Sequence, residues 1–208
     1  MNKFCLNIKR ELVSRQNNII SMPNIITDMS VNNKEDSLNL DNNSYKIAAV
    51  LFPLIEKNNQ LNVILTTRSK DLPSHPGQVC FPGGKLEKTD KNLIECAKRE
   101  SFEEVGIKSE QIKLLGQLDD CVTGTNYKVT PFIGLIDSNY IPVIQEKEVA
   151  DIFEVPLDYF IEKNNKKLES ANYKGKSYTY YQYNWKDKKI WGSTARIIVN
   201  FCEIMNLY

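Results

Sequence analysis

The chain has 208 residues, of which 41% are hydrophobic and 25% charged, a composition that suits one folded domain with a buried core. Its net charge is only +1, so no overall field would attract nucleic acid or an anionic membrane surface. No apolar run approaches the roughly 18 to 20 residues that span a bilayer. Composition therefore argues against nucleic acid and membranes as partners, and any anion that the protein binds must be held by a local arrangement of residues.

The five cysteines are scattered and form neither a CxxC pair nor a spacing typical of a metal site. They are interpreted as reduced thiols of an intracellular protein. The first residues lack the apolar stretch of a secretory signal, so the cytoplasm is the expected location. Basic residues near the N-terminus leave a mitochondrial or peroxisomal location open.

The first 44 residues differ in character from the rest of the chain. Residues 4–13 alternate apolar and basic side chains and predict one short helix, which the Asn17-Asn18 pair and Pro23 should limit. Residues 27–44 are rich in Asn, Ser and Asp and predict a linker or mobile arm, because they bury too little apolar surface to offset the entropy of ordering. The folded domain is expected to begin at Tyr45.

Two strands and a helix are predicted next along the chain. Apolar runs over residues 47–55 and 61–68 enclose the polar residues 56–60, which predicts a hairpin of two buried strands. A helical pattern follows over residues 91–105. It stops at Gly106, in the position where a left-handed residue commonly ends a helix.

The last third of the chain predicts more strands and a closing helix. Strands are expected over residues 112–118, 129–136, 148–155 and 178–185, the last as an aromatic edge strand. Residues 194–206 should form an amphipathic helix. The side chains expected on its buried face are Ile197, Ile198, Phe201, Cys202 and Met205. Together the elements predict the α/β class, with a mixed sheet and helices on both faces.

The predicted helix over residues 91–105 carries an unusual cluster of acids. Glu100, Glu103 and Glu104 stand at i, i+3 and i+4 and project from one side, where like charges repel by a few tenths of a kcal/mol per pair. A hard divalent cation would reverse that repulsion, since Mg²⁺ is commonly held by one or two carboxylates together with substrate phosphates. The alternative is an acidic face that is simply solvated.

The context of these acids resembles the Nudix hydrolase family. The segments Phe81-Pro82-Gly83-Gly84 and RESFEEVGI, residues 99–107, resemble the two ends of the family's loop-helix-loop signature, which closes with REUxEExGU, where U is aliphatic. The loop is one residue longer than in the family pattern, with Asp90 in the acidic role. The resemblance implies a Nudix-type α/β/α sandwich with a mixed sheet, formed by residues 45–208 behind an N-terminal extension of residues 1–44 that is partly flexible.

The resemblance also implies roles for the charged residues. Glu100 and Glu104 would be the main ligands of Mg²⁺ or Mn²⁺, with Glu103 as a third ligand or a contact through water. Arg99 would orient these carboxylates, so Arg99 and Glu103 are candidate catalytic residues. Glu148, which resembles the family's late acidic position, is the candidate general base, and a surface salt bridge is the alternative for it.

A longer resemblance concerns the substrate. Residues 65–84, LTTRSKDLPSHPGQVCFPGG, resemble the LLTxRSxxLxxHxGxVxFPGG signature of the Nudix coenzyme A diphosphatases, and residues 146–157 and 190–196 resemble their EVaxxFxVPL and WGxTAR segments. This implies metal-dependent hydrolysis of coenzyme A to 4′-phosphopantetheine and adenosine 3′,5′-bisphosphate. The residues expected to bind substrate are Arg68, Lys70, His75, Gly83, Gly84 and Lys85.

Alternatives stay open at this point. The cationic groups suit a substrate with several phosphates, but His75, the sole histidine, has an equally good interpretation as a structural hydrogen-bonding side chain. A diphosphatase acting on NADH, ADP-ribose or another nucleoside diphosphate derivative would use the same acidic helix. A ligand sensor without activity would keep the fold, although it would be expected to lose some of the three glutamates that this chain retains.

Overall fold

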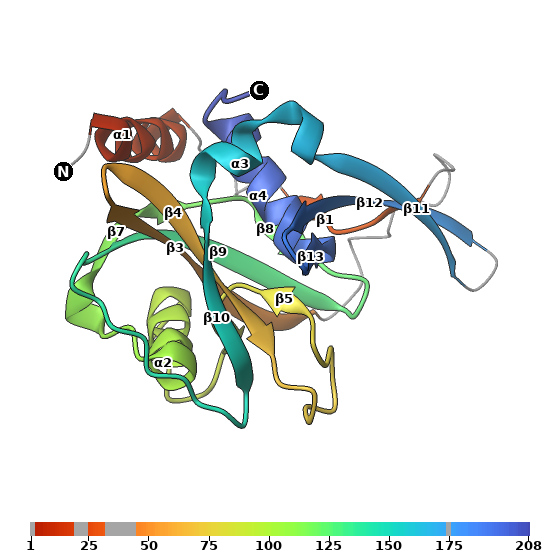
Figure 1. Ribbon diagram of the computed structural model, residues 1–208, viewed down its shortest axis with the longest axis horizontal. Helices are drawn as coiled ribbons and strands as arrows, with labels where there is room; N and C mark the ends of the chain where they lie inside the picture. Colours follow the sequence, from red (N-terminus) through yellow and green to blue (C-terminus); the bar gives the residue numbers. More distant parts are fainter. Residues whose placement is uncertain (1–2, 19–24, 32–44, 174–175) are drawn as a thin grey trace.

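The molecule is an α/β protein built around a nine-stranded mixed sheet (Figure 1). Helix α2 (Leu93–Val105) covers one face of this sheet, and α1 (Lys3–Asn18) and α4 (Gly192–Ile204) cover the other. The predicted fold class, an α/β/α sandwich with a mixed sheet, is therefore confirmed. The computed structural model describes residues 3–18, 25–31, 45–173 and 176–208.

The other elements are short helices and strands. The short helices are α3 (Leu157–Ile161), η2 (Ser109–Gln111) and η3 (Lys163–Asn165). The larger sheet contains β1 (Ile25–Thr27), β3 (Lys46–Lys57), β4 (Gln60–Arg68), β5 (Val79–Cys80), β6 (Gly83–Lys85), β7 (Ile112–Gln117), β8 (Asp120–Val122), β9 (Tyr127–Ile136) and β10 (Val149–Pro156). The smaller sheet contains β2 (Ser30–Val31), β11 (Lys167–Tyr173), β12 (Lys176–Trp185) and β13 (Lys188–Trp191).

Strand β3 is the centre of the larger sheet, whose main order is β1-β8-β9-β3-β4-β10. One side of β3 pairs in parallel with β9 along its length, from Lys46 opposite Tyr127 to Ile55 opposite Ile136. Its other side is shared: the end of β3 forms the predicted hairpin with β4, while its beginning pairs with the three-residue strand β6. A strand of three residues is thus inserted beside β3, next to helix α2.

The core fixes the segment that leads into β6. Phe52 of β3 is fully buried, with its ring centroid 4.7 Å from that of Phe81 and 5.0 Å from that of Phe201 on α4. Burying a side chain of this size stabilises the fold by about 1.5–3 kcal/mol. Phe81 directly precedes Pro82 and β6, so the packing of α4 and β3 also holds the glycine strand in place.

Most of the predicted elements are present. The hairpin β3–β4, helix α2, strands β7, β9 and β10, and helix α4 lie within a few residues of their expected positions, and the five side chains predicted to line the buried face of α4 and its end are all buried. The N-terminal helix is longer than expected, because α1 continues through the Asn17-Asn18 pair. None of the described helices is long and apolar enough to cross a membrane.

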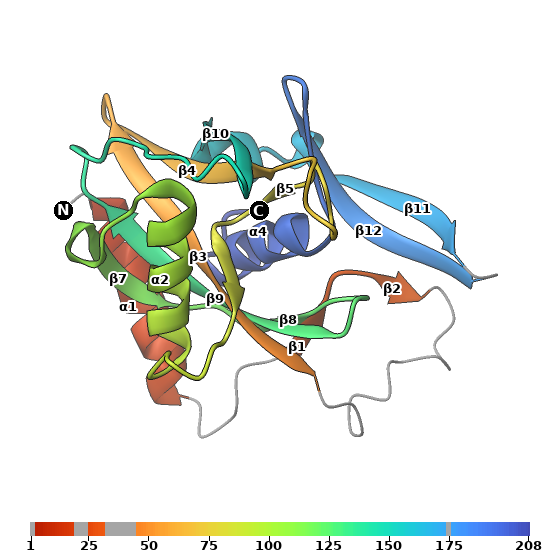
Figure 2. The same ribbon diagram turned by 90° about the horizontal axis from the view of Figure 1, so that it is seen from below.

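Two predictions were wrong. Residues 27–31 are not part of a mobile arm, because they contribute to β1, which pairs with β8, and to β2, which pairs with β12; residues 32–44 lie outside the described residues. Nor is the aromatic strand an edge strand: β12 pairs with β11 on one side and with β13 and β2 on the other. Figure 2 shows β12 alongside β11. Its neighbours are polar segments that alternation of hydrophobic residues does not identify.

Candidate active site

Helix α2 carries the acidic cluster and is capped at both ends. The side chain of Asn92 accepts a hydrogen bond from the Glu95 N–H at 3.0 Å, which satisfies one of the free donors of the first turn. Gly106 ends the helix with φ +76°, a conformation that glycine adopts without strain. Ala97, Ser101 and Val105 form another face of the helix, and their side chains are buried. This face holds α2 on the sheet and leaves the acids at its margin.

Glu100 and Glu104 lie against strand β6, where the two glycines make room for them. The Gly83 N–H donates a hydrogen bond to Glu104 Oε2 at 3.1 Å. A Cβ added to Gly84 would lie 2.5 Å from Cδ of Glu100. Gly83 has φ +155°, and a Cβ there would overlap the Ala49 carbonyl of β3. Gly83 is therefore required by close packing against β3, and Gly84 by the carboxylate of Glu100.

Arg99 neutralises part of this acidity and is itself held in place. Its Nε and Nη2 donate to the two oxygens of Asp90 at 2.9 and 3.0 Å, and Nη1 lies 3.0 Å from both Glu100 Oε1 and Glu103 Oε2. The hydrogen bonds from Arg99 hold the pKa of Asp90 at about 2. Asp90 thus faces Arg99 despite the longer loop, and it orients the guanidinium that in turn contacts Glu100 and Glu103.

The two carboxylates at β6 are poorly solvated. Glu104 is 3% exposed, and burial raises its pKa to about 8, with the charges of Glu100 and Glu148 acting in the same direction and the Gly83 hydrogen bond and Arg68 acting against it. Burial also raises the pKa of Glu100, against the opposing effect of Arg99. Two desolvated acids side by side are unfavourable when both are ionised, and a nearby cation would relieve the conflict.

This donor set fits a magnesium or manganese ion that shares its ligands with a substrate. Such ions take oxygen ligands and are usually held by one or two carboxylates, waters and substrate phosphates. Glu100 and Glu104 supply the two carboxylates. Within the described residues no three His, Cys, Asp or Glu side chains are gathered closely enough to enclose a metal ion, and the Glu103 side chain, 53% exposed, is paired with Arg99. Glu103 would have to leave Arg99 to act as a third ligand.

Two more of the residues singled out from the sequence lie near the acids. The charge of Arg68, at the end of β4, lowers the pKa of Glu104 against the effect of burial, and Arg68 Nε donates to the Ser74 carbonyl at 3.4 Å. Glu148 is exposed, and its charge raises the pKa of both Glu100 and Glu104. Its carbonyl accepts the Ser69 N–H at 2.8 Å, which joins the start of β10 to the end of β4.

Lys70 and His75 are not brought to the acids by any contact within the described chain. Both are exposed on the loop between β4 and β5. His75 has φ +55°, an uncommon conformation outside glycine, and its Nδ1 lies 3.0 Å from Gln78 Oε1. This contact agrees with the interpretation of His75 as a hydrogen-bonding residue of the loop.

Sequence reasoning missed a pair of residues beside Lys85. The ammonium groups of Lys46 and Lys85 lie 5.4 and 5.8 Å from the ring centroid of Tyr127. Lys46 begins β3 and Tyr127 begins β9, and the two face each other in the parallel register. No local pattern signals this cluster, because it depends on a pairing of strands that are far apart in the sequence.

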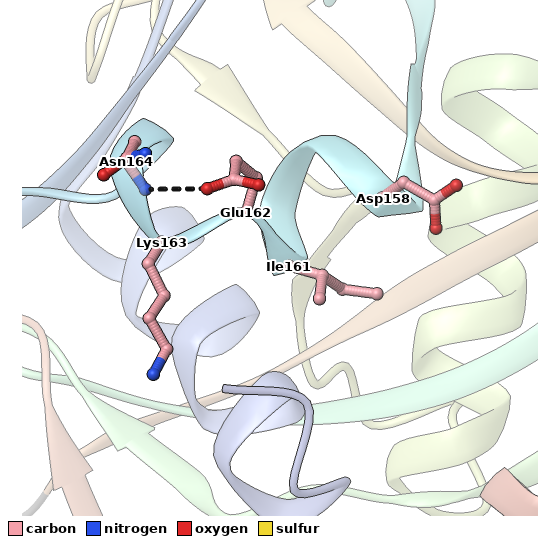
Figure 3. Close-up of a pocket in the computed structure, with 5 residues that line it drawn as sticks. All are labelled: Asp158, Ile161, Glu162, Lys163 and Asn164. Atoms are coloured by element: carbon pink, nitrogen blue, oxygen red, sulfur yellow. Dashed lines mark hydrogen bonds between the residues drawn. The ribbon is translucent and has the colours of Figure 1, made fainter.

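No residue of the acidic helix α2 lines either of the two described cavities. The larger, about 590 Å³, lies at α3 and η3 and is lined by Asp158, Ile161, Glu162, Lys163 and Asn164 (Figure 3). The smaller, about 200 Å³, is lined by six residues from β4, β10 and the loop before β10. The lining of the larger cavity comes from a single short stretch of chain, so it is a hollow between neighbouring residues and not a convergence of distant elements.

Comparison with known proteins adds a family relationship to this geometry. Residues 44–175 match the NUDIX domain family. The protein named Uncharacterized Nudix hydrolase NudL of Photorhabdus laumondii is 40% identical over 158 residues, which cover 76% of this chain and 83% of the relative. Its namesake from Yersinia enterocolitica is 36% identical, with coverage of 77% and 82%. A MutT/nudix family protein from Enterococcus faecalis aligns over 99% of this chain and 75% of its own, with 14% identity and a TM-score of 0.49.

The two glycines of β6 predict different outcomes when a methyl group is added. Gly84→Ala displaces only the flexible end of Glu100, so we expect a melting temperature close to wild type and a Mn²⁺ affinity lowered by about tenfold or more. Gly83→Ala meets backbone at a positive φ and should lower the stability by about 1–3 kcal/mol. Thermal melts and Mn²⁺ titration followed by electron paramagnetic resonance measure both. Unchanged Mn²⁺ affinity in Gly84→Ala would contradict the assigned contact.

Glu104 predicts a pH dependence of stability in the absence of metal. Its pKa in the folded protein is about 8, raised from 4.5, so the folded state keeps a proton that the unfolded chain releases. Stability should therefore fall as pH rises through this window. Glu104→Gln removes the effect, so its melting temperature should exceed that of wild type by more at about pH 9 than at about pH 5. An equal difference at both pH values would contradict the assignment.

Proposed function

Since this chain belongs to the Nudix family, we propose that it hydrolyses the diphosphate bond of coenzyme A and releases 4′-phosphopantetheine and adenosine 3′,5′-bisphosphate. Family membership supports a hydrolase acting on the diphosphate bond of a nucleoside derivative, with Mg²⁺ or Mn²⁺ as cofactor. The choice of coenzyme A as the particular substrate goes beyond family membership, and it rests on the segment of residues 65–84.

One observation about that segment carries the proposal. The end of β4 and the glycine strand β6 lie at its two ends, and both are next to the buried acid. The Gly83 N–H is hydrogen-bonded to Glu104, and the charge of Arg68 acts on the pKa of Glu104. These two links support contacts from Arg68 and the glycine strand to a substrate whose diphosphate lies beside Glu100 and Glu104.

In the proposed reaction the oxygen of a water attacks one phosphorus of the diphosphate and the bond from that phosphorus to the bridging oxygen breaks. Glu100 and Glu104 would hold a divalent cation, which polarises the phosphoryl oxygens and lowers the pKa of a water when bound. Glu148 accepts the proton of the attacking water as general base. Arg99, fixed by Asp90, is a positioning residue that keeps Glu100 and Glu103 oriented.

The cations near the site have separate tasks in this proposal. The charge of Arg68 acts on Glu104, so Arg68 is assigned to the diphosphate, whose negative charge increases on the leaving oxygen during the reaction. A guanidinium suits this role because it presents several donors to phosphate oxygens. Lys70 and His75 lie on the exposed loop, where the remaining parts of a large substrate would pass, and they are assigned to substrate binding outside the reaction centre.

The proposal predicts magnesium-dependent release of 4′-phosphopantetheine from coenzyme A. The measurement is mass spectrometry of the products, with NADH and ADP-ribose as competing substrates at equal concentration. We expect the highest kcat/KM for coenzyme A, and no turnover after complete chelation of divalent metal. A higher kcat/KM for NADH or ADP-ribose would assign the chain to another substrate within the family, while turnover that survives chelation would reject the metal mechanism.

Substitution of the two buried acids tests the reaction centre. Glu100→Gln and Glu104→Gln should each lower turnover on the order of 100-fold or more, because the amide cannot supply a charged oxygen ligand. Glu95→Gln on the first turn of the same helix is the matched control, since Glu95 pairs with Lys98, and it should keep wild-type turnover. Circular dichroism checks that all three variants are folded. Wild-type turnover in either of the first two variants would remove that residue from the site.

A further inference from the structure

One edge of strand β6 pairs with another strand, and the other edge contacts charged side chains of α2. It pairs with β3, and no other strand of the described chain pairs with its outer side. On this outer side the Gly83 N–H contacts Glu104 and the Lys85 carbonyl accepts from Arg99 Nη2 at 3.2 Å. Side chains alternate along a strand, so the side chain of Lys85 leaves on the face opposite to that on which Glu100 packs against Gly84. A substrate at the outer edge of β6 can therefore reach both faces.

The side chain of Lys85 meets a second lysine on that opposite face. Lys46 and Lys85 both place their ammonium groups within 6 Å of the Tyr127 ring centroid, at 5.4 and 5.8 Å. Both lysines are exposed, whereas the ring is half-buried and packs against the main core. The negative face of an aromatic ring attracts ammonium groups, so Tyr127 offsets part of the repulsion between the two lysines and keeps them together.

No acid in the described part of the chain forms an ion pair with either lysine. Among the described residues, neither Lys46 nor Lys85 has a carboxylate within ion-pair distance, whereas the neighbouring Lys128 lies 3.1 Å from Asp120. Two ammonium groups anchored on one ring match the two negative charges that a phosphate monoester carries near neutral pH. Two residues of strand, about 7 Å, separate Lys85 from the Gly83 N–H, a span that one nucleotide covers.

We propose that Lys46 and Lys85, held together by Tyr127, bind a phosphate monoester of the substrate that is separate from the diphosphate. In coenzyme A this group is the 3′-phosphate. The inference rests on the proposed function for the identity of the substrate, and it assigns the diphosphate and the monoester to two sides of one strand. Tyr127 acts here as a positioning residue, because it contacts the lysines and not the phosphate.

The test is isothermal titration calorimetry of the full chain with adenosine 3′,5′-bisphosphate and with adenosine 5′-monophosphate at one ionic strength. We expect wild-type protein to bind the bisphosphate about tenfold more tightly or better, since hydrogen bonds to charged groups are individually strong. Lys46→Ala, Lys85→Ala and Tyr127→Leu should bring the ratio of the two dissociation constants close to one. Tyr127→Phe keeps the ring and should keep the ratio. Lys88→Ala, an exposed lysine of the following loop, is the matched control and should also keep it.

Each other outcome overturns the inference. Equal binding of the two nucleotides by the wild type means that no monoester site exists. Equal losses for both nucleotides in the lysine variants mean that these lysines bind the phosphate common to the two ligands. An unchanged ratio of the two dissociation constants in both lysine variants means that other residues recognise the monoester.

The binding ratio does not require turnover, so a chain that fails to hydrolyse coenzyme A rejects the proposed function without deciding this test. Circular dichroism identifies any variant that is unfolded, and the lysine variants decide the question if Tyr127→Leu is one of them.

Discussion

The hydrogen bond from the Gly83 N–H to the Glu104 carboxylate joins helix α2 to strand β6 at the point where a side chain on either glycine would interfere. Glu104 is only 3% exposed, and this contact holds its carboxylate against the backbone of β6. Burial of an ionised acid is costly unless the acid is paired or bound to a metal. The remaining features of the site follow from it. Two residues of the strand must be glycine, the helix must be anchored on its other face, and a nearby cation would offset the negative charge.

The chain itself supplies only part of that charge. Arg99 is shared among Asp90, Glu100 and Glu103, so one guanidinium faces three carboxylates, and Glu104 is not among its partners. Asp90 takes the bidentate contact and holds the guanidinium still. The arrangement leaves a local excess of negative charge next to Glu104. That excess is favourable for a site that binds a divalent cation together with an anionic substrate, since each partner then neutralises the other.

Stability and activity make opposite demands on this part of the fold. The aromatic contacts of Phe52 with Phe81 and Phe201 and the buried stripe of α2 stabilise the surroundings of β6, while the acids beside it destabilise the metal-free protein. A rigid, well-packed support allows such local destabilisation to persist. The same strand separates the acidic edge from the lysine pair on the opposite face, so a few residues of backbone hold groups of opposite charge close to each other.

The sequence determined the elements whose signal is local. The buried hairpin β3–β4, the helix that ends at Gly106 and the apolar face of α4 follow from periodicity and from end signals, because these depend only on neighbouring residues. The acidic face of α2 and the glycine pair could likewise be predicted from the sequence. Tertiary structure alone decided which acids of that face are buried, since Glu104 meets β6 while Glu103, one residue earlier, turns to Arg99. It also placed Asp90 opposite Arg99, brought Tyr127 to Lys46 and Lys85, and surrounded the aromatic strand β12 with neighbours. Periodicity shows which face of an element is buried, but the partner on that face is set by long-range strand pairing, which no local pattern encodes.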